Sequence, residues 1–99
     1  MPAYVVANYA VTDHEGIEPY VPAAGPILAD AGGEVLVADV ETDVREGDAG
    51  HVTVVVRFDS KEAAEAWYTS NEYEAIKPLR TDHSTGVLVL ADGYVPASD

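Results

Sequence analysis

The sequence contains no cysteine and few positive charges, and each shortage excludes a group of functions. Without cysteine the chain forms no disulfide, offers no thiolate nucleophile and builds no zinc-cysteine site. Five Lys and Arg residues stand against 18 Asp and Glu residues, which gives a formal net charge of -13. Such a chain repels a phosphate backbone or an anionic membrane surface, so we expect neither nucleic acid nor membrane as a partner.

Long apolar runs and targeting signals are also missing. No apolar stretch approaches the roughly 18 to 20 residues of a membrane helix. The start of the chain, MPAYVVANYAV, lacks the basic region of a signal peptide, and we therefore expect a cytoplasmic protein. The length suits a single domain, 1–99, in which 96–99 form a polar tail.

The excess of acidic residues favours a salt-rich environment. Like charges repel one another within a folded chain, and dissolved salt screens that repulsion. Two of the 99 residues are lysines, so the surface is poor in lysine as well as rich in acid. We interpret the composition as halophilic, with an ordinary acidic protein as the alternative. Neither interpretation indicates an activity.

Runs of β-branched and aromatic residues predict four strands. They cover 3–11, 34–42, 51–59 and 84–95. In the third strand Val52, Val54, Val56 and Phe58 share one face, which we assign to the core. Arg57 lies on the other face.

Helical spacing of apolar residues predicts helices between these strands. The first helix lies between Ile17 and Ala31, and its prolines predict a kink or a late start. The second helix follows a cap at Asp59 or Ser60 and ends near Ser70. Ser70 then caps a further short helix, which Pro78 disturbs.

The element order is therefore β-α-β-β-α-β, which is typical of an α+β, ferredoxin-like fold with a four-stranded antiparallel sheet and helices on one face. The stretches VVANYAV, VLVADV and VLVLA are apolar on both faces, although a sheet with one wet face should alternate apolar and polar residues. The chain has no spare element for the second face. We therefore predict a homodimer in which two open sheet faces pack together.

Three stretches carry a resemblance to a known family: AYVVANYAVTD, GGEVLV and above all RFDSKEAAEAWYTSNEYEAIKPLR. They resemble the family called domain of unknown function 1330, within the dimeric α+β barrel superfamily. The similarity spans about 2 to 95, and its most specific part runs from Phe58 to Arg80. One departure is the proline-rich first helix, EPYVPAAGP.

The resemblance implies a dimeric α+β barrel built from ferredoxin-like subunits. Within the superfamily it also implies a choice of activities, because relatives include cofactor-independent monooxygenases, muconolactone-type isomerases, haem-degrading enzymes and ligand-sensing domains. A shared fold does not select one of these activities.

Residues 65–80 supply the first candidate ligand-binding residues. Trp67 lies on an apolar helical stripe, where it fills the core or lines a polar pocket. Tyr73 stands on the same helical face as Arg80, and a phenol beside a guanidinium can bind a carboxylate or enolate oxygen. The alternative is that Arg80 pairs with a neighbouring acid, Glu72 or Glu74.

Asn8 and Tyr20 complete the candidate ligand-binding residues. Asn8 interrupts an apolar strand, and a buried amide needs hydrogen-bond partners. It either satisfies a nearby backbone group or faces a cavity. Tyr4 and Tyr9 on the first strand and Tyr20 on the first helix can act similarly. Arg57 is expected at the dimer interface, paired with an acid of the other subunit.

His14, His51 and His83 are the side chains that normally titrate near neutrality. Their spacing matches no metal signature, so we expect no metal and no other cofactor. His83, within the polar stretch TDHST, is the best acid-base candidate. The candidate catalytic residues are His83, Tyr73 and Asn8, with a purely structural role as the alternative for each.

These observations favour an uncharacterised homodimer that binds a small organic molecule between helices and sheet. A second hypothesis is a cofactor-independent monooxygenase or isomerase, in which the candidate residues hold and deprotonate an activated ring or lactone. A third is a non-catalytic assembly or ligand-sensing module. Whether the protein is an enzyme stays open at this point.

Overall fold

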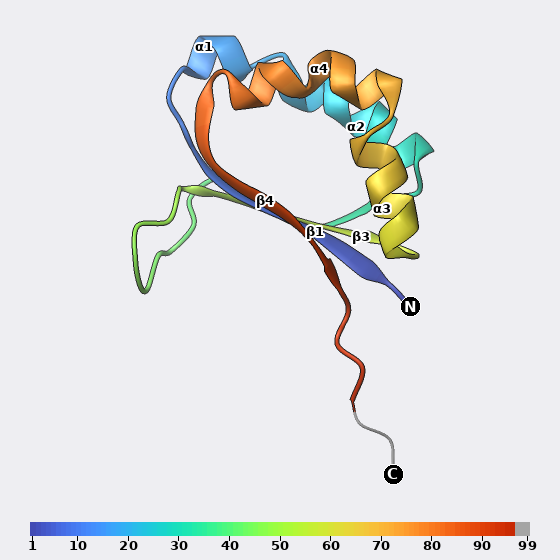
Figure 1. The fold of residues 1–99 in the computed structure, drawn as a ribbon. Helices are drawn as coiled ribbons and strands as arrows, with labels where there is room; N and C mark the ends of the chain where they lie inside the picture. The colour runs from blue at the N-terminus through green and yellow to red at the C-terminus, as the bar shows by residue number, and fades with distance from the viewer. Residues whose placement is uncertain (97–99) are drawn as a thin grey trace.

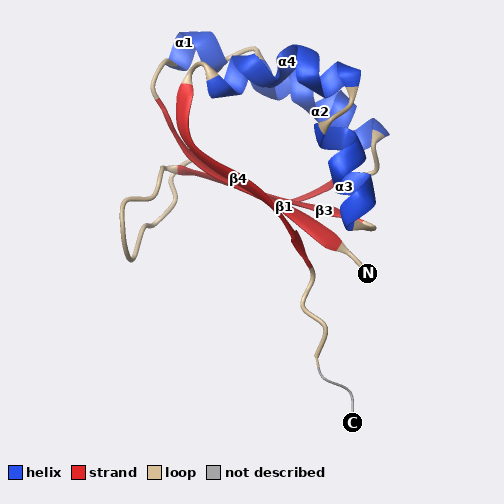
Figure 2. Ribbon diagram, viewed as in Figure 1, coloured by secondary structure: helices blue, strands red, loops and turns tan. Residues whose placement is uncertain are grey.

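A computed structural model describes residues 1–96 of the chain. Its elements are β1 (Ala3–Val11), α1 (His14–Ile17), α2 (Tyr20–Asp30), β2 (Glu34–Asp39), β3 (Val52–Phe58), α3 (Lys61–Tyr68), α4 (Asn71–Thr81) and β4 (Ser84–Asp92). The strands form one antiparallel sheet in the order β2-β3-β1-β4, and the helices lie on one side of it (Figure 1, Figure 2). The predicted α+β, ferredoxin-like fold is confirmed. Of the predicted tail, 97–99 lie outside the described residues.

The helix-covered face of the sheet forms the core. Buried residues alternate along β1, as a period of two requires, and in β3 they are Val52, Val56 and Phe58, with Val54 of the same face half-buried. The ring centroid of Trp67 lies 5.7 Å from that of Phe58 and 4.3 Å from that of Tyr73. These aromatic contacts anchor α3 and α4 to β3. The main buried cluster contains Val5, Val56, Phe58, Ala64, Trp67 and Tyr73.

The opposite face of the sheet carries no helix within residues 1–96 and is lined by valines. The strand register places four of them in one row across all four strands, which we call the valine row: Val37, Val55, Val6 and Val89. Val37 is 40% exposed and Val89 is 50% exposed. An apolar row on an open sheet face is typical of a surface that another molecule covers.

The two predicted serine caps begin α3 and α4. The Ser60 hydroxyl accepts a hydrogen bond from the backbone N–H of Ala63 at 3.1 Å, and the Ser70 hydroxyl accepts one from the backbone N–H of Tyr73 at 3.2 Å. The Ser70 cap therefore fixes the start of α4 and the position of Tyr73 in its first turn.

The first predicted helix forms as two pieces, α1 and α2, with Pro19 at the start of the second. Pro22 lies in the first turn of α2, where its missing N–H removes no bond. Pro26 lies inside α2 and cannot donate to the carbonyl four residues earlier. The helical segment is therefore interrupted before Tyr20, where α2 makes its late start, and α2 continues through Pro26.

The structure corrects three predicted boundaries. The last helix was expected to be disturbed at Pro78, yet α4 continues to Thr81 and so carries Arg80 in its final turn. β2 ends at Asp39 instead of residue 42, and β4 ends at Asp92 instead of residue 95.

Candidate functional site

A cavity of about 190 Å³ lies between α2 and the helix-covered face of the sheet. We call it the inner cavity. The polar side chains that line it belong to Tyr9, Tyr20, Trp67 and Arg80, and the remaining lining residues are apolar or glycine, from α2 and all four strands. Among the described residues that line it there is no Asp, Glu, His or Lys. The inner cavity is therefore apolar, with a single cation.

Arg80 brings a charged group to the inner cavity from the last turn of α4. Arg80 is 7% exposed, and its Nε atom has no hydrogen-bond partner within residues 1–96. In the same part of the chain no carboxylate lies within 4.0 Å of its guanidinium. The alternative pairing with Glu72 or Glu74 thus does not form, and Glu74 pairs with Lys77 instead.

The hydroxyl groups of Tyr20 and Tyr73 meet beside Arg80, with their oxygens 2.6 Å apart. Burial raises the pKa of Tyr20 far above its ordinary value; Tyr73 adds to the rise and Arg80 opposes it. Burial alone would lower the pKa of Arg80, but the oxygens of Tyr73 and Tyr20 outweigh that effect and the pKa is raised. At neutral pH the site therefore combines the neutral phenol of Tyr20 with a charged guanidinium.

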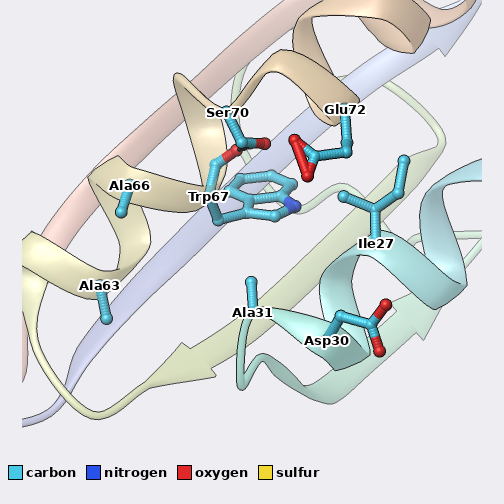
Figure 3. A pocket seen from close by; sticks show the side chains of 8 residues that line it. All are labelled: Ile27, Asp30, Ala31, Ala63, Ala66, Trp67, Ser70 and Glu72. Carbon is cyan, nitrogen blue, oxygen red and sulfur yellow. Dashed lines mark hydrogen bonds between the residues drawn. The ribbon is translucent and has the colours of Figure 1, made fainter.

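Trp67 lies between the inner cavity and a second hollow at the surface. This outer groove, of about 380 Å³, is lined by Ile27, Asp30, Ala31, Ala63, Ala66, Trp67, Ser70 and Glu72 (Figure 3). Trp67 is 5% exposed, and its indole Nε1, which lies on the side of Ile27 in Figure 3, has no hydrogen-bond partner in the described chain. The charged residues of the outer groove are acidic. Of these two hollows, the inner cavity alone offers a positive group.

Tyr20 gives the protein an expected loss of stability at high pH. An unfolded tyrosine ionises near pH ~10, whereas the pKa of folded Tyr20 is raised well above its ordinary value. This stability is present in full below the unfolded pKa and falls as the pH rises above it, because the unfolded chain then loses a proton that the folded chain keeps. Denaturation midpoints measured across this alkaline range should fall less steeply for Tyr20→Phe. Equal slopes for the wild type and Tyr20→Phe would contradict a raised pKa of Tyr20 in the folded protein.

Asn8 lies on the open face of the sheet, away from the inner cavity. Its Nδ2 donates to the carbonyl of Gly50 at 3.1 Å and its Oδ1 accepts from the Gly50 N–H at 2.7 Å. Its Nδ2 also lies 3.2 Å from the carbonyl of Val52 and 3.0 Å from Oγ1 of Thr53. Of the two roles expected for Asn8, the geometry fits backbone satisfaction, and Asn8 is not retained as a candidate for the inner cavity.

The histidines also lie apart from the inner cavity. His83 places Nδ1 2.8 Å from the carbonyl of Leu79 and Nε2 3.9 Å from a carboxylate oxygen of Asp13. His51 accepts the backbone N–H of Val11 through Nε2 at 3.1 Å. The structure thus brings Trp67, Tyr73, Arg80 and Tyr20 together and leaves His83 and Asn8 elsewhere.

Within residues 1–96 no group of three or more His, Asp or Glu side chains is arranged to hold a metal ion. None of the described helices has both the length and the apolar character needed to cross a bilayer. Arg57, expected at the dimer interface, lies 3.3 Å from Asp59 of its own chain.

Sequence reasoning gave Tyr9 the same two possible roles as Tyr20 but did not count it among the candidate ligand-binding residues, and it left two small residues out of the candidate site. Tyr9 shares the buried face of β1 with Val5 and Ala7, so its spacing of two could have placed it there. Burial raises its pKa above the ordinary value. Ala24 and Gly25 line the inner cavity from α2, and their small size leaves space for it. The small residues of the run PAAGP are the sequence feature that could have predicted this.

Solved structures with the same fold are distant in sequence. RPA0582, a protein of unknown function from Rhodopseudomonas palustris, has a TM-score of 0.78 at 14% identity over 96% of this chain and 84% of its own. SnoaB, a cofactor-independent oxygenase from Streptomyces nogalater, has a TM-score of 0.64 at 14% identity over 99% and 98%. An antibiotic biosynthesis monooxygenase has a TM-score of 0.53 at 17% identity over 97% and 100%. At these identities the likeness shows the fold alone.

Comparison at the level of sequence families is more specific than these structural matches. No curated protein shows significant similarity to the chain. A family model, in contrast, matches residues 2–94, almost the entire length. The resemblance carried by the stretch from Phe58 to Arg80 is thereby confirmed. The chain belongs to the family described as Domain of unknown function (DUF1330).

Proposed function

We propose that the protein is a homodimer in which each subunit binds a small organic molecule in its inner cavity. One observation carries the ligand: Nε of Arg80, a buried donor, has no partner within residues 1–96. Arg80 lines the inner cavity. A buried donor without a partner costs about 1–3 kcal/mol, and native proteins leave few of them. A bound molecule with acceptor atoms would remove that cost.

The size and the lining of the inner cavity support a ligand with one small ring. A cavity of about 150 Å³ holds benzene in a well-studied protein, and the inner cavity measures about 190 Å³. Apolar side chains from both the sheet and α2 would enclose the body of such a molecule. Small-molecule sites usually combine an apolar lining with a few polar groups, as the inner cavity does.

The valine row supports the homodimer. Its side chains come from all four strands, and Val89 is half exposed in the single subunit. A second copy brings an identical apolar row, so two open faces can pack together about a twofold axis. The charged side chains of this face, such as Arg57 and Asp39, lie on rows to either side of the valine row. An apolar centre with charges around it is typical of a protein interface.

Catalysis is the second candidate function, and the fold shared with the oxygenase SnoaB favours it. Arg80 and the Tyr20 hydroxyl suit a developing oxyanion, because both donate hydrogen bonds in an apolar space. Removal of a proton from a substrate needs a base, and no described lining residue titrates near neutral pH. We therefore place binding, as in a ligand-sensing module, ahead of monooxygenase or isomerase chemistry.

Toluene tests the cavity without testing charge. Trp67 is the single tryptophan of the chain, so its fluorescence reports on the inner cavity. Toluene should change that fluorescence saturably. Ala24→Leu fills part of the cavity and should weaken binding by about 10-fold or more. Ala23→Leu, on the same helix but outside the lining, is the matched control and should bind as the wild type does.

Two results would overturn the proposed cavity site. The first is the absence of saturable binding for every ring-sized probe, neutral or charged. The second is equal affinity of the wild type and Ala24→Leu, which would place the probe elsewhere on the protein.

A further inference from the structure

Arg80 differs from every other cation of the chain. The sequence contains five Lys and Arg residues, and four of them have a carboxylate partner within the described residues. Those pairs are Arg45–Asp43, Arg57–Asp59, Lys61–Asp92 and Lys77–Glu74. Arg80 has none within residues 1–96, and it is the buried one of the five.

The missing partner is notable because acids are so abundant. With 18 Asp and Glu residues in 99 positions, a carboxylate near Arg80 would be the ordinary outcome. The inner cavity instead presents phenols, which stay neutral because burial raises the pKa of both Tyr20 and Tyr9. Neutral hydroxyl groups solvate a guanidinium, yet they leave its charge uncompensated. An unpaired buried charge is strongly destabilising.

We infer that the ligand of the inner cavity is an organic monoanion, a weak acid in its ionised form with a small apolar body, whose charged oxygens pair with Arg80. This inference rests on the proposed binding function and adds the chemical class. Carboxylates and acidic phenolates or enolates share the required chemistry. A single guanidinium balances a single negative charge, so dianions such as phosphate esters fit less well.

The hydroxyl pair beside Arg80 supports the same class. Tyr20 and Tyr73 hold two hydroxyl protons but share one hydrogen bond, at 2.6 Å. One proton is therefore left to donate, and the electrostatic influence of Tyr73 and Tyr20 raises the pKa of Arg80 against the opposing effect of burial. A carboxylate placed there would accept from the free phenol proton and from Nε of Arg80. Charge-assisted hydrogen bonds of this kind are about twice as strong as neutral ones.

The test compares benzoate with benzamide by calorimetry on the full-length protein. The two molecules have nearly the same size and shape, and they differ in charge. The wild type should bind benzoate at least about 10-fold more tightly than benzamide. Arg80→Gln should abolish that preference by weakening benzoate alone. Arg80→Lys keeps the charge but loses the forked donor geometry, and it should retain part of the preference.

The outcomes separate this inference from the proposed function. Equal affinity of the wild type for benzoate and benzamide would overturn the anion and leave the cavity site standing. Binding of neither, together with no binding of toluene, would overturn both. The comparison of benzoate with benzamide in the wild type needs no variant. It therefore tests the inference even if Arg80→Gln fails to fold. A benzoate preference that survives in a folded Arg80→Gln protein would also overturn it.

Discussion

Replacement of Val89 by glutamate should convert the proposed dimer into a folded monomer. Val89 lies in the valine row and is 50% exposed in one subunit, so a single subunit tolerates a charge there. In the proposed dimer each copy would bury an unpaired carboxylate, which costs several kcal/mol per ion. We expect the dissociation constant to rise by about 100-fold or more, measured by sedimentation equilibrium.

Ala75→Glu is the matched control for Val89→Glu. It adds the same charge on an exposed position of α4, in the helical layer and away from the valine row. It should leave the dimer intact. Because each subunit carries a formal charge of -13, the dimer should also tighten as salt is raised. A wild-type monomer at both low and high salt, or a dimer unaffected by Val89→Glu, would contradict the proposed interface.

Phe58→Ala should cause a large loss of stability. Phe58 is 0% exposed and lies in the main core cluster beside Trp67. Truncation of a buried aromatic ring leaves a cavity and costs about 3–5 kcal/mol. For a domain of this size such a loss lowers the melting temperature by roughly 10 °C or more. Chemical denaturation at a fixed protein concentration measures it.

The control for Phe58→Ala is Val21→Ala, which truncates an apolar side chain that is 70% exposed. Its effect should stay within about 0.5 kcal/mol. If Phe58→Ala cost no more than Val21→Ala, the assignment of this face of β3 to the core would be wrong.

Most of the fold was predictable because its signals are local. The period of two in β3 placed Val52, Val56 and Phe58 on one buried face, and the structure buries them. Serine caps at Ser60 and Ser70 marked where two helices begin. The order of elements could then be read along the chain. The order β-α-β-β-α-β is typical of a ferredoxin-like fold, because the rules for connections leave few alternatives.

The errors lie where tertiary contacts override local preference. Pro78 removes a backbone donor, yet α4 continues because Tyr73 and Arg80 on the same helix are buried against the rest of the protein. The proline-rich segment 17–31, in contrast, predicted a kink or a late start, and α2 does start late, at Tyr20.

The candidate site was predictable in part for the same reason. Tyr73 and Arg80 lie seven positions apart on one helix, so their common face could be deduced from the sequence. The hydroxyl pair of Tyr20 and Tyr73 joins positions 53 apart, and only the assembled fold reveals it. The lack of a carboxylate near Arg80 is likewise a property of the whole structure. It favours the predicted ligand-binding role of Arg80 over the alternative of a pair with Glu72 or Glu74.

The most direct measurement is a nitrogen-15 NMR titration of the wild-type protein with benzoate. The single tryptophan gives one indole N–H signal, and Arg80→Lys identifies the side-chain Nε signal of Arg80 by its loss. Both residues line the inner cavity, and neither of the two groups has a partner within residues 1–96. We predict that both signals shift and saturate together at one benzoate per subunit. A benzoate concentration series that leaves both signals unmoved would contradict the account.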